Sequence, residues 1–172
     1  MGDLGKFRAA VERSADTLMQ ALRWKAKLHA DMLAGMTRAM TPVGIENGGR
    51  TRESIKSFVE VERDKDTITG GVKSDYPVAV FLEFGTGPVA EETGYPGDIQ
   101  VSHVAEGWWW YSGEAGQRIK AARHGGEPKD YSLFTYTRGQ PPKAMFYNAV
   151  QAYGDEIAKD FGDTILEVLR DE

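Results

Sequence analysis

Apolar side chains recur at three- and four-residue steps through residues 6–40, which is the period of one helical face. The stripe consists of Phe7, Val11, Ala15, Leu18, Leu22, Met32, Met36 and Met40. Lys25 and His29 interrupt the stripe in the middle, so we expect this helix to be buried over only part of its length. Pro42 disfavours helical geometry at the preceding residue, which predicts that the helix ends near Thr41. A helix this long can extend beyond a small domain and pack against another subunit.

A second long apolar stripe predicts a closing helix over residues 143–169. Its members are Phe146, Val150, Tyr153, Ile157, Phe161, Ile165 and Val168. Pro141 and Pro142 are well placed to open this helix, because the N–H that proline lacks has no helical partner in a first turn. Gly154 and Gly162 lower its helical propensity.

A shorter helix is predicted over residues 76–84, where Tyr76, Val80 and Phe84 share one face and Phe81 flanks it. Ser74 or Asp75 can cap this central helix at its start, and Gly85 can end it. Upstream of it, residues 43–49 form a predicted loop and residues 50–55 a predicted short helical turn.

Strands are predicted where β-branched and aromatic residues gather. Residues 56–62 and 67–73 form one such pair, and the polar turn at 63–66 joins them as a hairpin. Residues 131–137 alternate aromatic and polar side chains and predict another strand. Between the central helix and that strand, residues 88–129 are rich in Gly, Glu and turn signals.

The order of elements is helix, two strands, short helix, loop-rich strands and helix. It indicates an α+β fold, in which an antiparallel sheet packs against a long N-terminal helix, a short central helix and a C-terminal helix. We expect one domain covering residues 1–172, with a loop-rich insertion or arm at about 88–130.

Composition narrows the possible functions. Of the 172 residues, 41% are hydrophobic and 27% are charged, which is typical of a globular chain with a real core. The formal net charge is −5, so nucleic acid is a poor expected ligand, because phosphate contacts dominate its affinity. The absence of cysteine excludes disulfides and thiolate chemistry and fits a reducing cytoplasm. We expect neither a signal peptide nor a membrane span.

Candidate catalytic groups are sparse. The three histidines, His29, His103 and His124, show no metal-binding spacing, and no HExxH motif is present. Acidic residues near His103 could help it to hold a metal in the folded state, or they could be solvated loop residues; these are Glu91, Glu92, Glu106 and Glu114. No GxSxG elbow presents a serine nucleophile. We therefore expect a protein that is not an enzyme, with no catalytic, cofactor-binding or metal residues.

The glycines of Gly85-Thr86-Gly87 do not predict a nucleotide loop. The motif follows a predicted helix, and the dipole at the C-terminal end of a helix repels anions. No Gly-Lys-Ser or Gly-Lys-Thr sequence follows it.

The run Trp108-Trp109-Trp110-Tyr111 has three interpretations. Alternate residues of a strand face opposite sides, so the rings could fill a core on both faces. Outward rings could instead anchor a subunit interface, where Trp and Tyr are favoured. A platform that stacks on carbohydrate is the third possibility.

Basic residues cluster in two stretches of the sequence. They are Arg50, Arg52, Lys56 and Arg63 in one stretch, and Arg118, Lys120, Arg123 and Lys129 in the other. Such runs are usually solvated surface. A partner-facing role for Arg50 and Arg52 is the alternative.

Three pieces in fixed order resemble a known family. The first piece is Thr41-Pro42-Val43, a glycine loop and Gly49-Arg50-Thr51-Arg52-Glu53-Ser54-Ile55. The second is Tyr76-Pro77-Val78-Ala79-Val80-Phe81-Leu82-Glu83-Phe84-Gly85-Thr86-Gly87. The third is Gly107-Trp108-Trp109-Trp110-Tyr111 with Tyr136-Thr137-Arg138-Gly139-Gln140-Pro141-Pro142 and Met145-Phe146-Tyr147-Asn148-Ala149. In this combination the chain resembles the tailed-phage neck and tail-component family that includes the lambda-type minor tail protein Z.

The resemblance implies a structural subunit of the virion that forms a homo-oligomeric neck or tail-completion ring at the head–tail junction. Its implied partners are other copies of itself and neighbouring head-closure, tail-terminator or tail-tube proteins, with DNA passing nearby without specific binding. The interface residues expected on this reading are Arg50, Arg52, Phe84, Gly85, Thr86, Gly87, Trp108, Trp109, Trp110, Arg138, Gln140 and Pro141. The alternatives are a tail terminator of related fold, or a carbohydrate-binding or hydrolytic module that uses Trp108 to Tyr111 with Glu106, Glu114 or His103.

Overall fold

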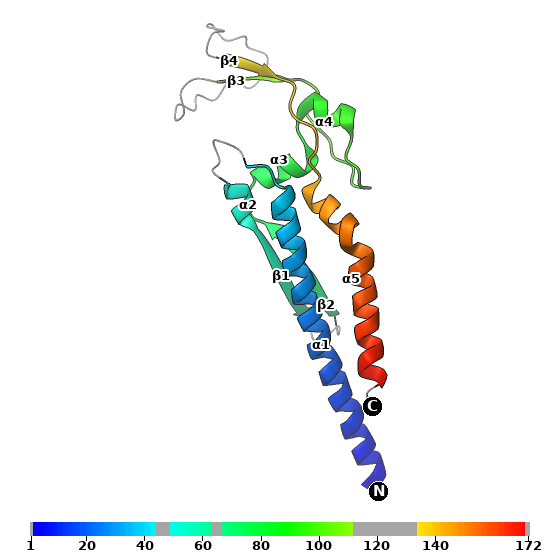
Figure 1. The fold of residues 1–172 in the computed structure, drawn as a ribbon. Coiled ribbons are helices and arrows are strands. Elements are labelled where there is room, and N and C mark those ends of the chain that lie inside the picture. The colour runs from blue at the N-terminus through cyan, green and yellow to red at the C-terminus, as the bar shows by residue number, and fades with distance from the viewer. Residues whose placement is uncertain (1, 44–48, 63–66, 112–133, 171–172) are drawn as a thin grey trace. The chain divides into compact units, whose positions relative to one another are not determined.

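The computed structural model describes residues 2–43, 49–62, 67–111 and 134–170 (Figure 1). Along these residues the helices and strands are α1 (Gly2–Met40), α2 (Arg50–Ser54), β1 (Ile55–Glu62), β2 (Thr67–Ser74), α3 (Val78–Phe84), α4 (Gly87–Thr93), β3 (Trp108–Tyr111), β4 (Phe134–Thr137) and α5 (Met145–Arg170). The predicted α+β class is confirmed, with its long N-terminal, short central and C-terminal helices. The predicted turn at 63–66 and most of the predicted loop at 43–49 lie outside the described residues.

The strands form two antiparallel ribbons of two strands each within the described part of the chain. In the first ribbon, β1 pairs with β2 from Ile55 opposite Ser74 to Glu62 opposite Thr67. In the second ribbon, β3 pairs with β4, so that Trp108 lies opposite Thr137. The strand predicted over residues 131–137 is described only from Phe134.

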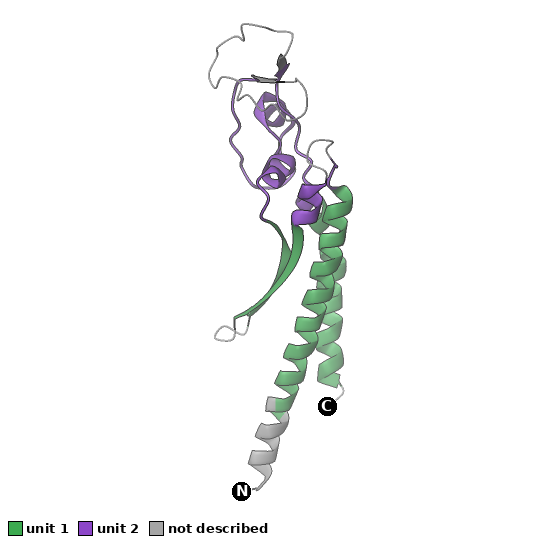
Figure 2. Ribbon diagram, turned by 90° about the vertical axis from the view of Figure 1, so that its left-hand side faces the viewer, with its two compact units in different colours: residues 1–40, 55–74, 148–172 green, residues 41–54, 75–147 purple. Residues whose placement is uncertain are grey.

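The chain divides into two compact units (Figure 2). Unit 1 contains residues 1–40, 55–74 and 148–172, and unit 2 contains residues 41–54 and 75–147. The expectation of one domain with an arm at 88–130 stays a prediction, because residues 112–133 of that arm lie outside the described residues.

In unit 1, the β1–β2 hairpin packs along α1, and α5 lies beside α1 (Figure 1). Small side chains on α1 let the hairpin approach closely: Ala26 and Ala30 are buried, and a Cβ atom built at Gly70 would lie 3.2 Å from the Ala26 carbonyl oxygen. The Arg38 guanidinium donates two hydrogen bonds, of 2.6 and 3.0 Å, to the Ile55 carbonyl oxygen. These contacts fix the start of the hairpin along α1.

Unit 2 has a small core around the start of α5. Met145 and Ala90 are fully buried, and Thr41 and Thr51 are nearly so. The Thr41 hydroxyl donates a 3.1 Å hydrogen bond to the Met145 sulfur. The core therefore holds together segments that lie far apart in the sequence.

Three details of the predicted helices in unit 2 are wrong. Pro77 occupies the N-cap position of α3 and no side chain caps it, so neither Ser74 nor Asp75 has the predicted role. Helix α4 was not predicted, because its opening Gly87-Pro88 is typical of a loop, although proline also fits the first turn of a helix. Helix α5 begins only at Met145, so the two prolines precede it and do not open it.

Candidate functional site

Two glycines with positive φ shape the turn between α3 and α4. Gly85 has a φ of 76° and Gly87 a φ of 64°, and both are buried. A Cβ atom at Gly85 would lie 2.7 Å from the Gln140 carbonyl oxygen, and one at Gly87 would lie 2.6 Å from the Arg138 carbonyl oxygen. Both the positive φ and the lack of space therefore exclude any residue other than glycine at Gly85 and Gly87. The Gly-Thr-Gly motif is therefore a packing element of unit 2.

Thr86 and Gln140 form an antiparallel bridge between the two sequence motifs. The Thr86 N–H donates to the Gln140 carbonyl at 2.9 Å, and the Gln140 N–H donates to the Thr86 carbonyl at 3.1 Å. The neighbouring Gly139 has a φ of 93°, and a Cβ atom there would overlap the Thr86 carbonyl oxygen at 1.9 Å. The side chain of Gln140 also donates to the Phe81 carbonyl at 3.2 Å. The structure thus brings together Phe84 to Gly87 and Arg138 to Pro141.

Glu83 lies at the centre of this junction, although it was not among the predicted site residues. It is only 5% exposed, and its carboxylate accepts hydrogen bonds from the N–H groups of Phe146 at 2.9 Å and Tyr147 at 3.1 Å. These are the second and third residues of α5, whose N–H groups have no partner within the helix. The Tyr95 hydroxyl donates to the same carboxylate at 2.7 Å. Glu83 therefore caps α5 from another segment, and the dipole at the helix N-terminus favours its negative charge.

The ring of Tyr95 packs against two other aromatic rings. Its centroid lies 4.9 Å from that of Phe84 and 5.7 Å from that of Tyr147. Burial raises the pKa of the Tyr95 hydroxyl well above its ordinary range, and the hydrogen bond to Glu83 raises it further. At neutral pH this tyrosine is therefore a fixed donor, and Phe84 has a packing role within the chain.

His103 also belongs to this junction. Its side chain is 8% exposed, with Nε2 lying 2.9 Å from the Phe84 carbonyl oxygen and Nδ1 lying 3.1 Å from the Glu91 carboxylate. Both partners are acceptors, so a ring nitrogen that carries a hydrogen can donate to the one that faces it. Of the acids near His103, Glu91 and Glu92 are well exposed, at 66% and 61% of their side chains. Glu114 and His124 lie outside the described residues.

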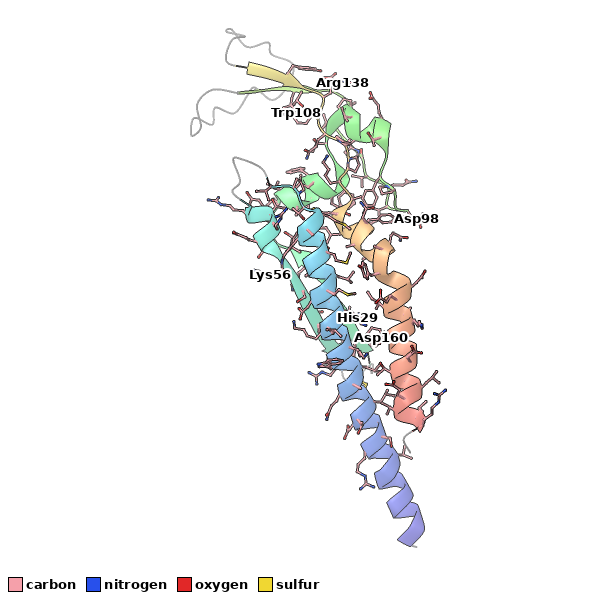
Figure 3. All side chains as sticks on the ribbon, in the orientation of Figure 1. His29, Lys56, Asp98, Trp108, Arg138 and Asp160 are labelled. Carbon is pink, nitrogen blue, oxygen red and sulfur yellow. The ribbon has the colours of Figure 1, made fainter. Side chains whose placement is uncertain are left out.

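The exposed part of unit 2 carries the first residue of the tryptophan run. Trp108 is 39% exposed, and Tyr136 on the paired strand β4 is 50% exposed. Arg138, near Trp108 in Figure 3, pairs with the Glu92 carboxylate. The side chains of Trp109 and Trp110 lie outside the described part of the chain, so their predicted roles stay predictions.

The two arginines near α2 differ in their surroundings. Arg50 is exposed, whereas Arg52 is half-buried and donates a 2.6 Å hydrogen bond to the Thr41 carbonyl oxygen. Arg52 thus ties α2 to the segment that follows α1. Only Arg50 is exposed enough for the partner-facing role that both were expected to have.

Unit 1 contains a cavity of about 310 Å³ between α1, β2 and α5. We call it the unit 1 cavity; its lining residues are Ala26, His29, Ala30, Leu33, Ile68, Thr69, Gly70, Ile157 and Phe161. His29 is 8% exposed. Its Nε2 atom lies 2.7 Å from the Asp160 carboxylate, and the Lys25 ammonium lies 2.7 Å from the other oxygen of that carboxylate. Figure 3 shows His29 and Asp160 facing each other from α1 and α5.

Lys25 and His29 favour the charged form of the Asp160 carboxylate in unit 1. Hydrogen bonds from Lys25 and then from His29 hold the pKa of Asp160 below its ordinary value. Since a carboxylate only accepts, the hydrogen of the His29 ring lies on Nε2. The His29 Nδ1 atom is buried and has no hydrogen-bond partner among the described residues.

Sequence reasoning missed both Glu83 and the pairing of Lys25 and His29 with Asp160. A signal was present in each case. Asp160 lies next to Phe161 on the apolar face of the closing helix, and Glu83 lies within an apolar helix between Leu82 and Phe84. A single acid on a buried face requires a partner. The sequence pattern does not identify that partner.

The described residues contain no group of three His, Asp or Glu side chains that could hold a metal ion. Their helices also include none that is both long enough and apolar enough to cross a membrane. The arrangement consists of a hydrogen-bonded junction in unit 2, a cavity lined mainly by apolar residues in unit 1, and exposed apolar side chains on both units.

Comparison of the sequence with protein-family models and curated proteins, and of the structure with solved structures, found no significant match.

Proposed function

We propose that this chain is a structural subunit of a tailed bacteriophage particle, which forms an oligomeric neck or tail-completion ring at the head–tail junction. DNA passes through this ring, and no covalent chemistry is involved. The proposal combines the order of the three sequence motifs with the surface of the folded chain.

The observation that carries the proposal is the exposure of large apolar side chains on regular elements. On α1, Trp24 is 62% exposed and Leu28 is 46% exposed. On α3, Val80 and Phe81 are both more than half exposed. On α5 the exposed apolar residues are Val150, Ile165, Leu166 and Leu169. Apolar side chains on neighbouring turns of helices favour burial against another protein.

The motif residues support the same function indirectly. The Thr86–Gln140 bridge and the Glu83 cap connect the segments of unit 2, and Trp108 and Tyr136 are exposed on the same unit. Hot spots of protein interfaces are enriched in tryptophan and tyrosine.

The net charge of −5 suits a subunit that DNA passes without adhering. Phosphate contacts by Lys and Arg dominate affinity for DNA, and a negative surface repels the duplex. The net negative charge therefore supports a ring through which DNA passes and argues against a DNA-binding role.

Native mass spectrometry and cryo-electron microscopy of the purified chain test this proposal. We expect a closed ring, either alone or with a head-closure, tail-terminator or tail-tube protein of the same particle. A ring that binds only the end of the tail tube would assign the chain as a tail terminator. A chain that stays monomeric with all of these proteins would contradict the proposal, as would cleavage or binding of a glycan that depends on Trp108.

A further inference from the structure

The side of α1 that faces away from the β1–β2 hairpin carries exposed apolar side chains. Ala26 marks the opposite side, because its carbonyl oxygen lies close to Gly70 of the hairpin. Trp24 and Leu28 each lie two positions from Ala26, which is roughly 200° around the helix. Trp24 is 62% exposed and Leu28 is 46% exposed. These two residues, on neighbouring turns of one side, form an open apolar surface that we call the Trp24 face.

Helix α5 has a similar open surface on its side away from α1. Its inner side is marked by Asp160, which pairs with side chains of α1, and by Thr164, which is only 5% exposed. Gly162 and Leu166 each lie two positions from Thr164, again roughly 200° around the helix. Leu166 is 49% exposed, and Leu169, three positions later, is 61% exposed. We call the surface formed by Gly162, Leu166 and Leu169 the Gly162 face.

Gly162 makes a hollow in this face. Its φ is not positive, and a Cβ atom built there would meet nothing within 4 Å. The fold of the chain therefore does not require glycine at this position, although glycine weakens a helix. A residue without a side chain, one turn before the exposed Leu166, lets a flat ring from another molecule approach the backbone closely. Gly154 has the same open space, but the residue one turn after it is Ala158 and not a leucine.

The charges at the Gly162 face restrict what can cover it. Asp163 and Glu167 are exposed and follow Gly162 and Leu166 directly in the sequence. Two such faces from two copies would bring these carboxylates together, and like charges across an interface oppose binding. The helix as a whole exposes more acids than bases; these residues are Asp155, Glu156, Asp163 and Glu167 against Lys159 and Arg170. The favoured partner is therefore an apolar surface that carries positive charge.

The Trp24 face meets this requirement. Its exposed neighbouring bases are Arg23 and Lys27. Lys27 pairs with Asp31 of its own chain, so the positive charge at this face comes mainly from Arg23. The exposed apolar pair Val80 and Phe81 on α3 does not meet it, because that helix contains no basic residue. Charge complementarity thus favours a second copy of this chain, bound through α1, as the occupant of the Gly162 face.

We propose that the Trp24 face of one copy packs against the Gly162 face of the next copy, with the Trp24 ring over the Gly162 backbone and beside Leu166. Tryptophan is a favoured hot-spot residue in such contacts. The contact joins two different faces, so it can repeat from copy to copy and closes a ring when the rotation allows. This inference rests on the proposed function, because it names the surfaces through which the copies of the ring would meet.

Replacing Gly162 by alanine separates the contact from the stability of the fold. Gly162→Ala and Gly154→Ala should each raise the melting temperature of the dilute, monomeric chain by roughly 2 °C, because alanine is the better helix former. Only at position 162 does the added methyl group occupy the space that the indole ring needs. By native mass spectrometry, we expect Gly162→Ala to associate roughly tenfold more weakly than the wild type and Gly154→Ala to associate equally well. Equal association of the two variants would overturn the proposal.

Mixing two variants tests whether the two faces meet each other. Trp24→Ala removes the ring and keeps the Gly162 face, whereas Gly162→Ala combined with Leu166→Gln disables that face and keeps Trp24. We expect each variant alone to associate at least roughly 30-fold more weakly than the wild type. Together they should form a one-to-one pair and no larger species, because only one productive contact is left. A mixture that stays monomeric would refute the contact. Val11→Ala, at an exposed apolar position on α1, is the control and should assemble normally.

Reversing one charge tests the choice of occupant. Arg23→Glu should weaken association roughly fivefold at low salt, and less at high salt, because it places a carboxylate opposite Asp163 and Glu167. Unchanged association at low salt would contradict the assignment of the Trp24 face as the partner.

The outcomes also distinguish this contact from the proposed function. Rings that form equally well with Trp24→Ala and with Gly162→Ala would show that the contact is wrong, while the proposed ring stands. Copies that join through these faces into open chains would keep the contact and contradict the ring. A wild-type chain that stays monomeric with its particle partners would overturn both.

Discussion

The Tyr95 hydroxyl donates a 2.7 Å hydrogen bond to Glu83 Oε1, which also accepts the N–H of Tyr147 at 3.1 Å. The second oxygen of this carboxylate accepts the N–H of Phe146 at 2.9 Å. One buried side chain thus joins α3, the segment after α4 and the start of α5. This arrangement explains why an acid lies within the otherwise apolar sequence of α3.

Glu83→Gln should destabilise the chain by about 1–3 kcal/mol. An amide keeps one accepting oxygen and places N–H donors where the other oxygen was, so at least one donor of α5 loses its partner inside the protein. Urea unfolding followed by circular dichroism measures the change. The exposed Glu106→Gln is the matched control and should alter the free energy of unfolding little. Equal stability of the two variants would contradict the capping role of Glu83.

Tyr95 should make the chain sensitive to alkaline pH. Its folded-state pKa lies above the ordinary value of 10.0, so the unfolded chain loses this proton first. The stabilising effect is complete below pH 10 and should decline as pH rises above it. Tyr95→Phe should be less stable than the wild type at pH 8, and its stability should fall less steeply above pH 10. Thermal unfolding at pH 8 and above pH 10 measures this difference. An equal loss of stability with rising pH in the wild type and in Tyr95→Phe would contradict the prediction.

Gly85→Ala should be much more harmful than Gly94→Ala. The two glycines have nearly the same backbone, with φ of 76° and 74° and extended ψ, which L residues rarely adopt at a cost of about 1–3 kcal/mol. A Cβ atom at Gly85 would also collide with Gln140 and Pro142 at 2.7 Å, whereas one at Gly94 meets nothing within 4 Å. The difference in unfolding free energy between the variants isolates the collision. Similar losses of unfolding free energy in the two variants would contradict this prediction, because they would show that the backbone around the Thr86–Gln140 bridge moves aside easily.

Asp160 should contribute to the acid stability of unit 1. Hydrogen bonds from Lys25 and His29 lower its folded-state pKa below the ordinary value of 3.8. The stabilisation is therefore present above pH 3.8 and should be lost as pH falls through the lower, folded-state value. Asp160→Asn should lower the melting temperature at pH 6 and reduce its decline below pH 4. The exposed Asp163→Asn is the control, and an identical pH dependence in both variants would rule out the pairing.

The regular elements were predictable because their patterns are local. The three- and four-residue spacing from Phe7 to Met40 gave α1, and the β-branched residues before and after the turn at 63–66 gave β1 and β2. Helix α4 was missed because Gly87-Pro88 has the local signature of a loop. The exact start of α5 was missed because it depends on Glu83, which lies 63 positions before Phe146 in the sequence.

The candidate sites were predictable only in part, for a physical reason. The motif around Gly85 and Gln140 was recognisable as important, but its residues were expected at an interface and many of them pack within unit 2. Distant pairs such as His29 with Asp160 leave no periodic trace. A buried charge indicates that a partner exists, while the fold alone decides which residue it is.

The bridge between Thr86 and Gln140 joins residues 54 positions apart. The bridge thus holds the two ends of the stretch between Thr86 and Gln140 next to each other. Each doubling of its length costs only about 0.6 kcal/mol in closure entropy. An insertion in this stretch should therefore cost little where it leaves Ala90, Tyr95 and His103 in place, because these three residues belong to the junction that holds Phe84 and Glu83.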